Sequence, residues 1–110
     1  MNTVIETNAY LAASKDAGMS EDERSEVVDL LAANPQAGKI MPGCGGARKL
    51  RHKKPGTGKS GGYRIITYYG GDKVPVFLLT VFGKNEKDNL SKDERNALSV
   101  LTKRLSDGLK

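Results

Sequence analysis

The sequence predicts an α+β fold in which a small antiparallel β-sheet of three to four strands packs against two N-terminal helices and one C-terminal helix. Two capping boxes, Ser20-Glu21-Asp22-Glu23 and Ser91-Lys92-Asp93-Glu94, mark the starts of two helices. Between them, the hydrophobic pattern changes from helical spacing to the alternation of strands. With 110 residues, the chain is expected to form one domain, residues 1–110, with one modest core.

The N-terminal third contains a short strand and both N-terminal helices. Thr3–Glu6 is a possible edge strand, and a helix is expected over Asn8–Ala17. The next helix begins near Ser20 and runs to about Ala33. Residues spaced three and four apart form its predicted apolar face: Val27, Leu30 and Leu31.

The rest of the chain alternates loops and strands before a closing helix. Gln36–Gly46 is rich in glycine and is predicted to be a loop, followed by strands over Ala47–His52 and Tyr63–Tyr69. Val74–Phe82 is almost wholly apolar, which is typical of a central strand covered on both faces. The helix that begins near Ser91 has a predicted apolar stripe of Ala97, Leu98, Leu101 and Leu105.

Basic residues are concentrated in the middle of the chain. The net charge is +5 at pH 7, and the stretch Leu30–Gly71 contains no aspartate or glutamate. A one-sided field of this kind favours an anionic partner, such as nucleic acid, an anionic membrane or an acidic protein. The basic residues of this stretch are Lys39, Arg48, Lys49, Arg51, Lys53, Lys54, Lys59 and Arg64.

Strand alternation predicts where some of these charges point. If Leu50 faces the helices, Lys49 and Arg51 on the same strand point away from them. If Ile65 faces the helices on the neighbouring strand, Arg64 joins the same open face. Three cations are therefore expected on one surface of the sheet. The alternative interpretation is a solvated face without a partner.

The numbers of cysteines and histidines argue against an internal disulfide and against a zinc site. Cys44 is the only cysteine and His52 the only histidine, so the chain has neither an internal disulfide nor a zinc constellation. Cys44 is interpreted as an inert loop thiol. His52 falls on the Leu50 side, away from the cations, which favours a strand residue over a general base. No cofactor is implied.

The segment from Gly56 to Ser60 looks like the end of a P-loop, but the match fails. The P-loop pattern needs a glycine five residues before Gly58, where Lys53 stands, and it needs a helix afterwards. A basic loop that contacts phosphates is favoured instead. The longest apolar run is far too short to span a membrane, and the N-terminus lacks a signal-peptide pattern. A cytoplasmic protein without a membrane partner is therefore expected.

Three segments together resemble the RelE/HigB-type toxins of bacterial type II toxin–antitoxin systems, in particular the HigB-like branch. They are residues 45–51 (GGARKLR), 58–69 (GKSGGYRIITYY) and 78–86 (LLTVFGKNE). The resemblance also covers the order of elements over nearly the whole chain. It implies a RelE-like fold and a metal-independent endoribonuclease that enters the ribosomal A site. Such an enzyme cleaves translated mRNA and inhibits translation until a HigA/RelB-like antitoxin blocks it.

The resemblance also suggests roles for individual residues. Arg64 would clamp the phosphate, while Lys49 and Arg51 would stabilise the transition state or shuttle protons. Lys84 would lie near the leaving group, and Glu86 is a candidate base or a structural partner for Lys84. Contacts with RNA are expected from Arg48, Lys53, Lys54, Lys59 and Asn85.

Two positions depart from the family pattern. Asn85 stands where the family has a positive residue, and Ser91 aligns with a tyrosine that some members carry at the start of the final helix. The tyrosine base of RelE-type toxins therefore has no obvious counterpart. Two other functions stay open: a non-catalytic nucleic-acid-binding module, for which a basic sheet face suffices, and an inhibitor-like protein that docks to an acidic partner.

Overall fold

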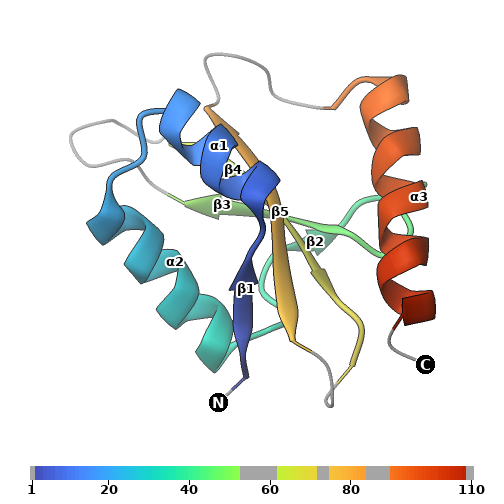
Figure 1. Cartoon of the computed structure of the whole chain (residues 1–110), viewed down its shortest axis with the longest axis horizontal. Helices are drawn as coiled ribbons and strands as arrows, with labels where there is room; N and C mark the ends of the chain where they lie inside the picture. Colours follow the sequence, from blue (N-terminus) through green and yellow to red (C-terminus); the bar gives the residue numbers. More distant parts are fainter. Residues whose placement is uncertain (1, 53–61, 72–74, 84–89, 109–110) are drawn as a thin grey trace.

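Helices cover both faces of a five-stranded sheet in the computed structural model, which describes residues 2–52, 62–71, 75–83 and 90–108. Figure 1 shows the first two helices on one side of the sheet and the last helix on the other. In chain order, the elements are β1 (Val4–Glu6), α1 (Asn8–Asp16), α2 (Glu21–Ala33), β2 (Lys39–Ile40), β3 (Arg48–His52), β4 (Tyr63–Tyr69), β5 (Val76–Gly83) and α3 (Lys92–Gly108). The predicted α+β class is confirmed.

The sheet is mixed and has one strand more than the largest predicted number. Its strand order is β1-β5-β4-β3-β2, with β3, β4 and β5 joined by antiparallel pairs as predicted, and β2 paired antiparallel with β3. The edge strand β1 pairs with β5 in parallel, so the sheet is mixed where the sequence predicted antiparallel pairing. The short strand β2 lies within the segment predicted to be a loop. Two residues are too few to show the alternation that reveals a strand.

Capping explains why α2 and α3 begin where they do. The Ser20 hydroxyl accepts from the Glu23 backbone N–H at 3.1 Å, and the Glu23 carboxylate accepts from the Ser20 N–H at 2.9 Å. Ser91 and Glu94 form the same reciprocal pair, at 3.2 and 2.9 Å. Each box satisfies donors that the first helical turn leaves without intrahelical partners. Both predicted capping boxes are confirmed.

A first hydrophobic core fills the space between the sheet and the helices α1 and α2. Tyr10 of α1, with Val27 and Leu31 of α2, is fully buried there. The facing strand residues include Leu50, Tyr63, Ile65, Val76, Leu78 and Val81. Leu30, predicted on the same helix face, is 42% exposed. The buried stripe of α2 instead continues to Glu23, whose carboxylate has hydrogen-bond partners inside the protein.

A second core lies on the other face of the sheet, under α3. Leu98 of α3 packs with Cys44, Ala47, Ile66, Tyr68, Leu79 and Phe82. This face was predicted to be open, and that prediction was wrong because the closing helix and residues 41–47 cover part of it. The central strand β5 contributes residues to both cores, as its continuous apolar sequence predicts.

The buried stripe of α3 differs from the predicted one by a rotation about the helix axis. Leu101 is 39% exposed and Ala97 is exposed, whereas Thr102 is only 1% exposed. The Thr102 hydroxyl donates to the carbonyl oxygens of Ser99 at 3.0 Å and Cys44 at 3.5 Å. Because its hydroxyl is hydrogen-bonded, Thr102 can be buried, although hydropathy alone predicts that the neighbouring Leu101 is the buried residue.

Candidate functional site

Three predicted site residues lie side by side on neighbouring strands. In the β3–β4 register, Lys49 is opposite Ile66 and Arg51 is opposite Arg64, while Arg64 is opposite Phe82 of β5. Ile66 and Phe82 belong to the second core, so all three cations point to the face of the sheet that carries α3. Strand alternation therefore placed these residues on one face as predicted. We call Lys49, Arg51 and Arg64 the cation row.

The three side chains differ in exposure. Arg51 is exposed and Lys49 is half-buried, but Arg64 is only 2% exposed, with Nη1 donating to the Tyr63 carbonyl oxygen at 3.4 Å. The expectation that Arg64 is a surface residue was wrong, because the face is partly covered. A guanidinium keeps its charge even when buried, and its field is screened less there than at the surface. Arg64 thus adds positive potential beneath the exposed part of the cation row.

The register of the cation row has an electrostatic cost. Arg51 and Arg64 are directly opposite each other on an antiparallel pair. Like charges directly opposite each other are unfavourable in a sheet. A phosphate placed over the row would offset this repulsion, since it interacts favourably with both guanidinium groups.

Two other basic or titratable residues of β3 point to the opposite face. Arg48 Nη1 donates to the carbonyl oxygens of Gln36 at 3.2 Å and Gly38 at 3.4 Å, so it braces the segment before β2. His52 Nε2 lies 3.2 Å from Glu26 Oε2 of α2. The structure therefore does not bring Arg48 or His52 together with the cation row.

The remaining predicted residues cannot be added to this geometry. Lys53, Lys54, Lys59, Lys84, Asn85 and Glu86 lie outside the described residues, and their roles stay predictions. Ser91, which was predicted to stand at the position of the family tyrosine, uses its hydroxyl in the capping box of α3. On the strands β3, β4 and β5, the face of the cation row contains no described histidine, aspartate or glutamate.

The two tyrosines with strongly shifted pKa values lie in the first core. Burial raises the pKa of Tyr10 to about 12, with a further contribution from Glu6. Burial also raises the pKa of Tyr63 to about 12, helped by the charge of Glu23 and by the hydrogen bond to it. The Tyr63 hydroxyl lies 3.2 Å from Glu23 Oε1. Both phenols stay protonated at neutral pH and stabilise the fold on the side opposite the cation row.

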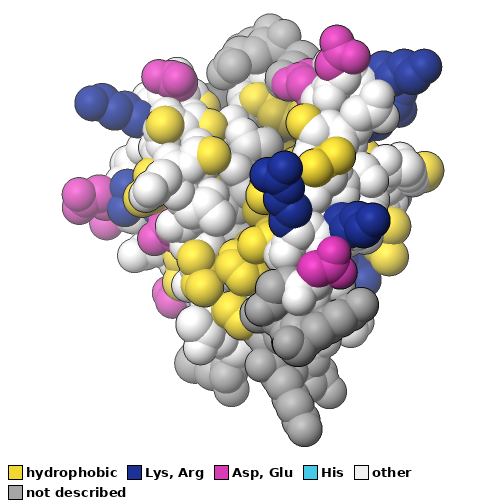
Figure 2. Space-filling view, turned by 45° about the vertical axis from the view of Figure 1, so that its right-hand side comes forward, with side chains coloured by type: hydrophobic (Ala, Val, Ile, Leu, Met, Phe, Trp, Pro, Cys, Tyr) yellow, Lys and Arg dark blue, Asp and Glu magenta, His cyan; other side chains and the backbone are white. Residues whose placement is uncertain are grey.

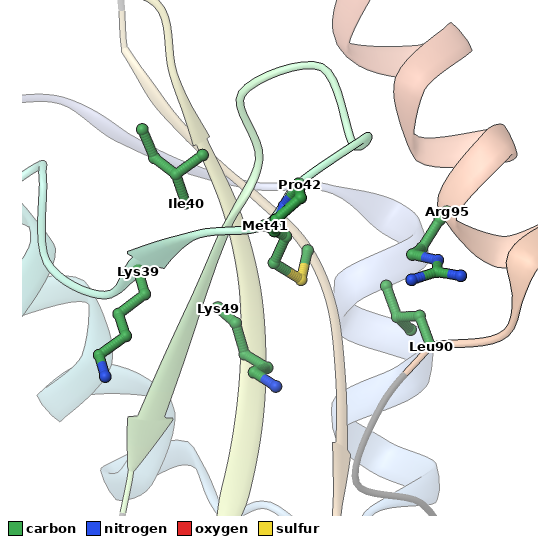
Figure 3. A pocket seen from close by; sticks show the side chains of 7 residues that line it. All are labelled: Lys39, Ile40, Met41, Pro42, Lys49, Leu90 and Arg95. Atoms are coloured by element: carbon green, nitrogen blue, oxygen red, sulfur yellow. The ribbon is translucent and has the colours of Figure 1, made fainter.

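A cavity of about 610 Å³ lies next to the cation row, between the β2–β3 pair and the start of α3. Lys49 belongs to both the row and the cavity wall. Figure 3 shows Lys49 and Arg95 extending into the space between β3 and α3, with Met41 and Leu90 beside them. The described lining residues are Lys39, Ile40, Met41, Pro42, Lys49, Leu90 and Arg95.

Two of these cations were not among the predicted site residues. Lys39 belongs to the two-residue strand β2, which carries no recognisable pattern. Arg95 precedes the buried Leu98 by three residues, so it lies on the side of α3 that turns toward the sheet, although its own side chain is exposed. Correct placement of the buried stripe of α3 would have pointed to Arg95. Figure 2, in which α3 comes forward, shows basic side chains beside hydrophobic ones on this side of the molecule.

Comparison with known families assigns the chain to one of them. The model of the family described as "RelE toxin of RelE / RelB toxin-antitoxin system" matches residues 10–109. The chain belongs to the RelE toxin family. This RelE-family chain is a toxin of the toxin–antitoxin type, and the family implies an antitoxin as its partner. Among the described residues of the RelE-family toxin, we find no helix with the length and apolar composition needed to cross a membrane.

Proposed function

We propose that this RelE-family toxin is a ribosome-dependent, metal-independent endoribonuclease of the HigB-like branch that cleaves translated mRNA and thereby inhibits translation. The observation that supports the proposal most directly is the cation row: Lys49, Arg51 and Arg64 share one sheet face, and two of them are directly opposite each other. RelE-family toxins generally have ribosome-dependent endoribonuclease activity. The family match to residues 10–109 therefore supports the same class of reaction.

The proposed reaction is attack of a ribose 2′-hydroxyl on the adjacent phosphate. A base removes the 2′-hydroxyl proton, and the 2′-oxygen forms a bond to phosphorus. The bond from phosphorus to the 5′-oxygen breaks, and that oxygen takes up a proton. The products are a 2′,3′-cyclic phosphate and a free 5′-hydroxyl. The intermediate carries more negative charge than the ground state, so fixed cations stabilise it preferentially.

The positions of the cations suggest how they divide the work. Arg51 is exposed and is proposed to contact the scissile phosphate directly. Lys49 is half-buried and is proposed to stabilise the developing charge or to deliver a proton. The buried Arg64 is proposed to strengthen the positive potential under the phosphate. Lys84 and Glu86 remain proposals for the leaving-group side and for the base.

The same positive face suggests how an antitoxin would neutralise the toxin. We propose that an acidic or amphipathic segment of a HigA/RelB-like antitoxin covers the cation row or wedges against it. The absence of carboxylates from Leu30 to Gly71 gives such a segment a surface of complementary charge. An antitoxin that binds only a distant surface and leaves cleavage intact would contradict direct neutralisation.

The experiment that tests the nuclease compares Arg51→Ala with Lys15→Ala. Lys15 is exposed in the last turn of α1, on the other side of the sheet, so its loss changes the net charge equally. Each variant is added to purified ribosomes that are translating a message, and cleavage is measured by mapping new 5′ ends. The assay is repeated with a chelator of divalent cations, which is added after the toxin has bound the ribosome. Arg51→Ala should lower the cleavage rate about a hundredfold, and Lys15→Ala less than about twofold.

The alternative function is a basic nucleic-acid-binding module without catalysis. In that case the wild-type chain would bind RNA but produce no new 5′ ends inside codons. Arg51→Ala would then weaken the affinity for RNA modestly and lower the salt dependence of binding, and no variant would show a measurable cleavage rate.

A further inference from the structure

The cavity beside the cation row has the chemistry of a nucleotide site. Three of its seven described lining residues are cations, and the others are Ile40, Met41, Pro42 and Leu90, with no carboxylate among them. Its volume of about 610 Å³ lies within the roughly 300–1,000 Å³ typical of ligand pockets. An apolar wall suits the face of a base, while the cations suit the phosphates on either side of it.

Two of the three cations around the cavity, Lys39 and Arg95, belong to neither of the ion pairs seen between described residues. Within the described residues, the ion pairs are Arg24 with Glu6 and His52 with Glu26. Lys39 and Arg95 are exposed and take part in neither pair. An anion that enters the cavity therefore competes with no described carboxylate for these two side chains.

The cavity shares one residue, Lys49, with the cation row. Lys49 lines the cavity and stands two residues before Arg51 on the same side of β3. Two positions along a strand span about 7 Å, which is close to the distance between successive phosphates of an extended RNA strand. A nucleotide in the cavity can therefore belong to the same strand as a phosphate over the cation row.

We propose that this cavity holds a nucleotide next to the scissile phosphate of the RNA, with Arg95 and Lys39 as its positioning residues. The inference rests on the proposed function, because it assigns a neighbouring nucleotide of the same substrate. Arg95 contacts the phosphate or the base edge, Lys39 contacts the phosphate, and the base packs on Met41 and Leu90. The guanidinium of Arg95 also presents paired donors that can distinguish one base from another.

Binding can be measured without cleavage by using a trinucleotide whose scissile 2′-hydroxyl is replaced by hydrogen. In protein labelled with ¹³C at methionine methyl groups, Met41 reports on the cavity. Met19, 8% exposed in the first core, is the internal control. The trinucleotide should shift the Met41 signal and leave the Met19 signal unchanged. Binding that shifts neither signal, or shifts both equally, overturns the proposal.

Arg95→Ala and Arg104→Ala form a matched pair on the same helix. Arg104 is nine residues later, which places it about half a turn from Arg95, and it does not line the cavity. Arg95→Ala should weaken trinucleotide binding about tenfold and reduce the salt slope by about 0.7, as expected for one lost phosphate contact on a single strand. Arg104→Ala should change affinity less than about twofold. Equal effects of the two substitutions overturn the proposal.

The outcomes separate this inference from the proposed nuclease function. A wild-type chain that cleaves nothing on ribosomes, but whose Met41 signal shifts with the trinucleotide, refutes the nuclease and supports the cavity. Cleavage without a Met41 shift refutes the cavity and supports the nuclease. An acidic peptide that shifts Met41 where the trinucleotide does not would assign the cavity to a protein partner. Lys39→Ala provides a second variant from a different element, and it should weaken binding in the same direction as Arg95→Ala.

Discussion

Attachment of α3 to the sheet depends on a close approach at Gly45. Gly45 has a φ of +68°, and a Cβ atom at this position would clash with Thr102 Oγ1 and lie 3.3 Å from the Cα atom of Ser99. Gly43 has a similar φ of +75°, but a Cβ atom there meets nothing within 4 Å. Alanine at either position adopts a left-handed conformation that costs roughly 1–2 kcal/mol. Only Gly45→Ala adds the clash.

The expected difference between the two variants follows from the contacts of Thr102. Its hydroxyl bonds to the carbonyls of Ser99 and Cys44, so moving it aside loses hydrogen bonds worth about 1 kcal/mol and forces an unfavourable rotamer at about 1 kcal/mol. Gly45→Ala should therefore destabilise the protein by about 3–4 kcal/mol, and Gly43→Ala by about 1–2 kcal/mol. The entropy that alanine removes from the unfolded chain is the same in both and cancels.

Urea denaturation of both variants measures this difference as a change in the midpoint at constant slope. Introducing Gly45→Ala and Gly43→Ala into a Thr102→Ala background should shrink the gap, because the clashing oxygen is gone. If the two glycine variants differ by less than about 0.5 kcal/mol in the native background, close packing of α3 against Gly45 does not stabilise the protein. Since Arg95 lies on α3, Gly45→Ala should also weaken trinucleotide binding more than Gly43→Ala does.

Three further predictions concern buried or paired side chains. Tyr63→Phe removes the hydroxyl bond to Glu23 and should cost about 1.5 kcal/mol in urea denaturation. Because the Tyr63 pKa is raised from 10.0 to about 12, wild-type stability should fall as the pH rises from 10 to 12, and Tyr63→Phe should make that fall shallower. His52→Ala should leave ribosomal cleavage within about twofold of wild type and cost less than about 1 kcal/mol, since the Glu26 partner side chain is 66% exposed. Arg64→Ala should lower the rate of cleavage and should also lower the free energy of unfolding by about 1–3 kcal/mol. An unchanged denaturation midpoint would show that burial of Arg64 does not contribute to stability.

Sequence patterns predicted most of the fold because helix capping and strand alternation depend on residues that are close together in the sequence. Capping boxes gave the starts of α2 and α3, and β4 has the predicted bounds, Tyr63–Tyr69. Strand alternation is equally local, so it placed the cation row on one face. The apolar sequence of β5 predicted burial on both faces, although the sequence does not say which helix covers which face.

The errors arose where tertiary contacts decide the outcome. Burial of Arg64 depends on covering the sheet face, and the pattern of β4 alone contains no information about that cover. The orientation of α3 depends on a hydroxyl, at Thr102, that finds partners in residues far along the chain. The cavity is lined by residues from β2, β3 and the start of α3, and no sequence pattern indicates that these three segments lie side by side. Arg95 could therefore be recognised only after these segments were placed in space.

The arrangement of the cation row suggests why part of its face is covered. An exposed row of like charges would be strongly screened by water and salt, which weakens its effect on a phosphate. Burial of Arg64 reduces that screening, while exposure of Arg51 keeps the face accessible to RNA. Arg51 and Arg64 are directly opposite each other, and like charges in that position repel. An acidic antitoxin segment or an RNA phosphate removes this repulsion on binding, so either partner should stabilise the toxin more in low salt than in high salt.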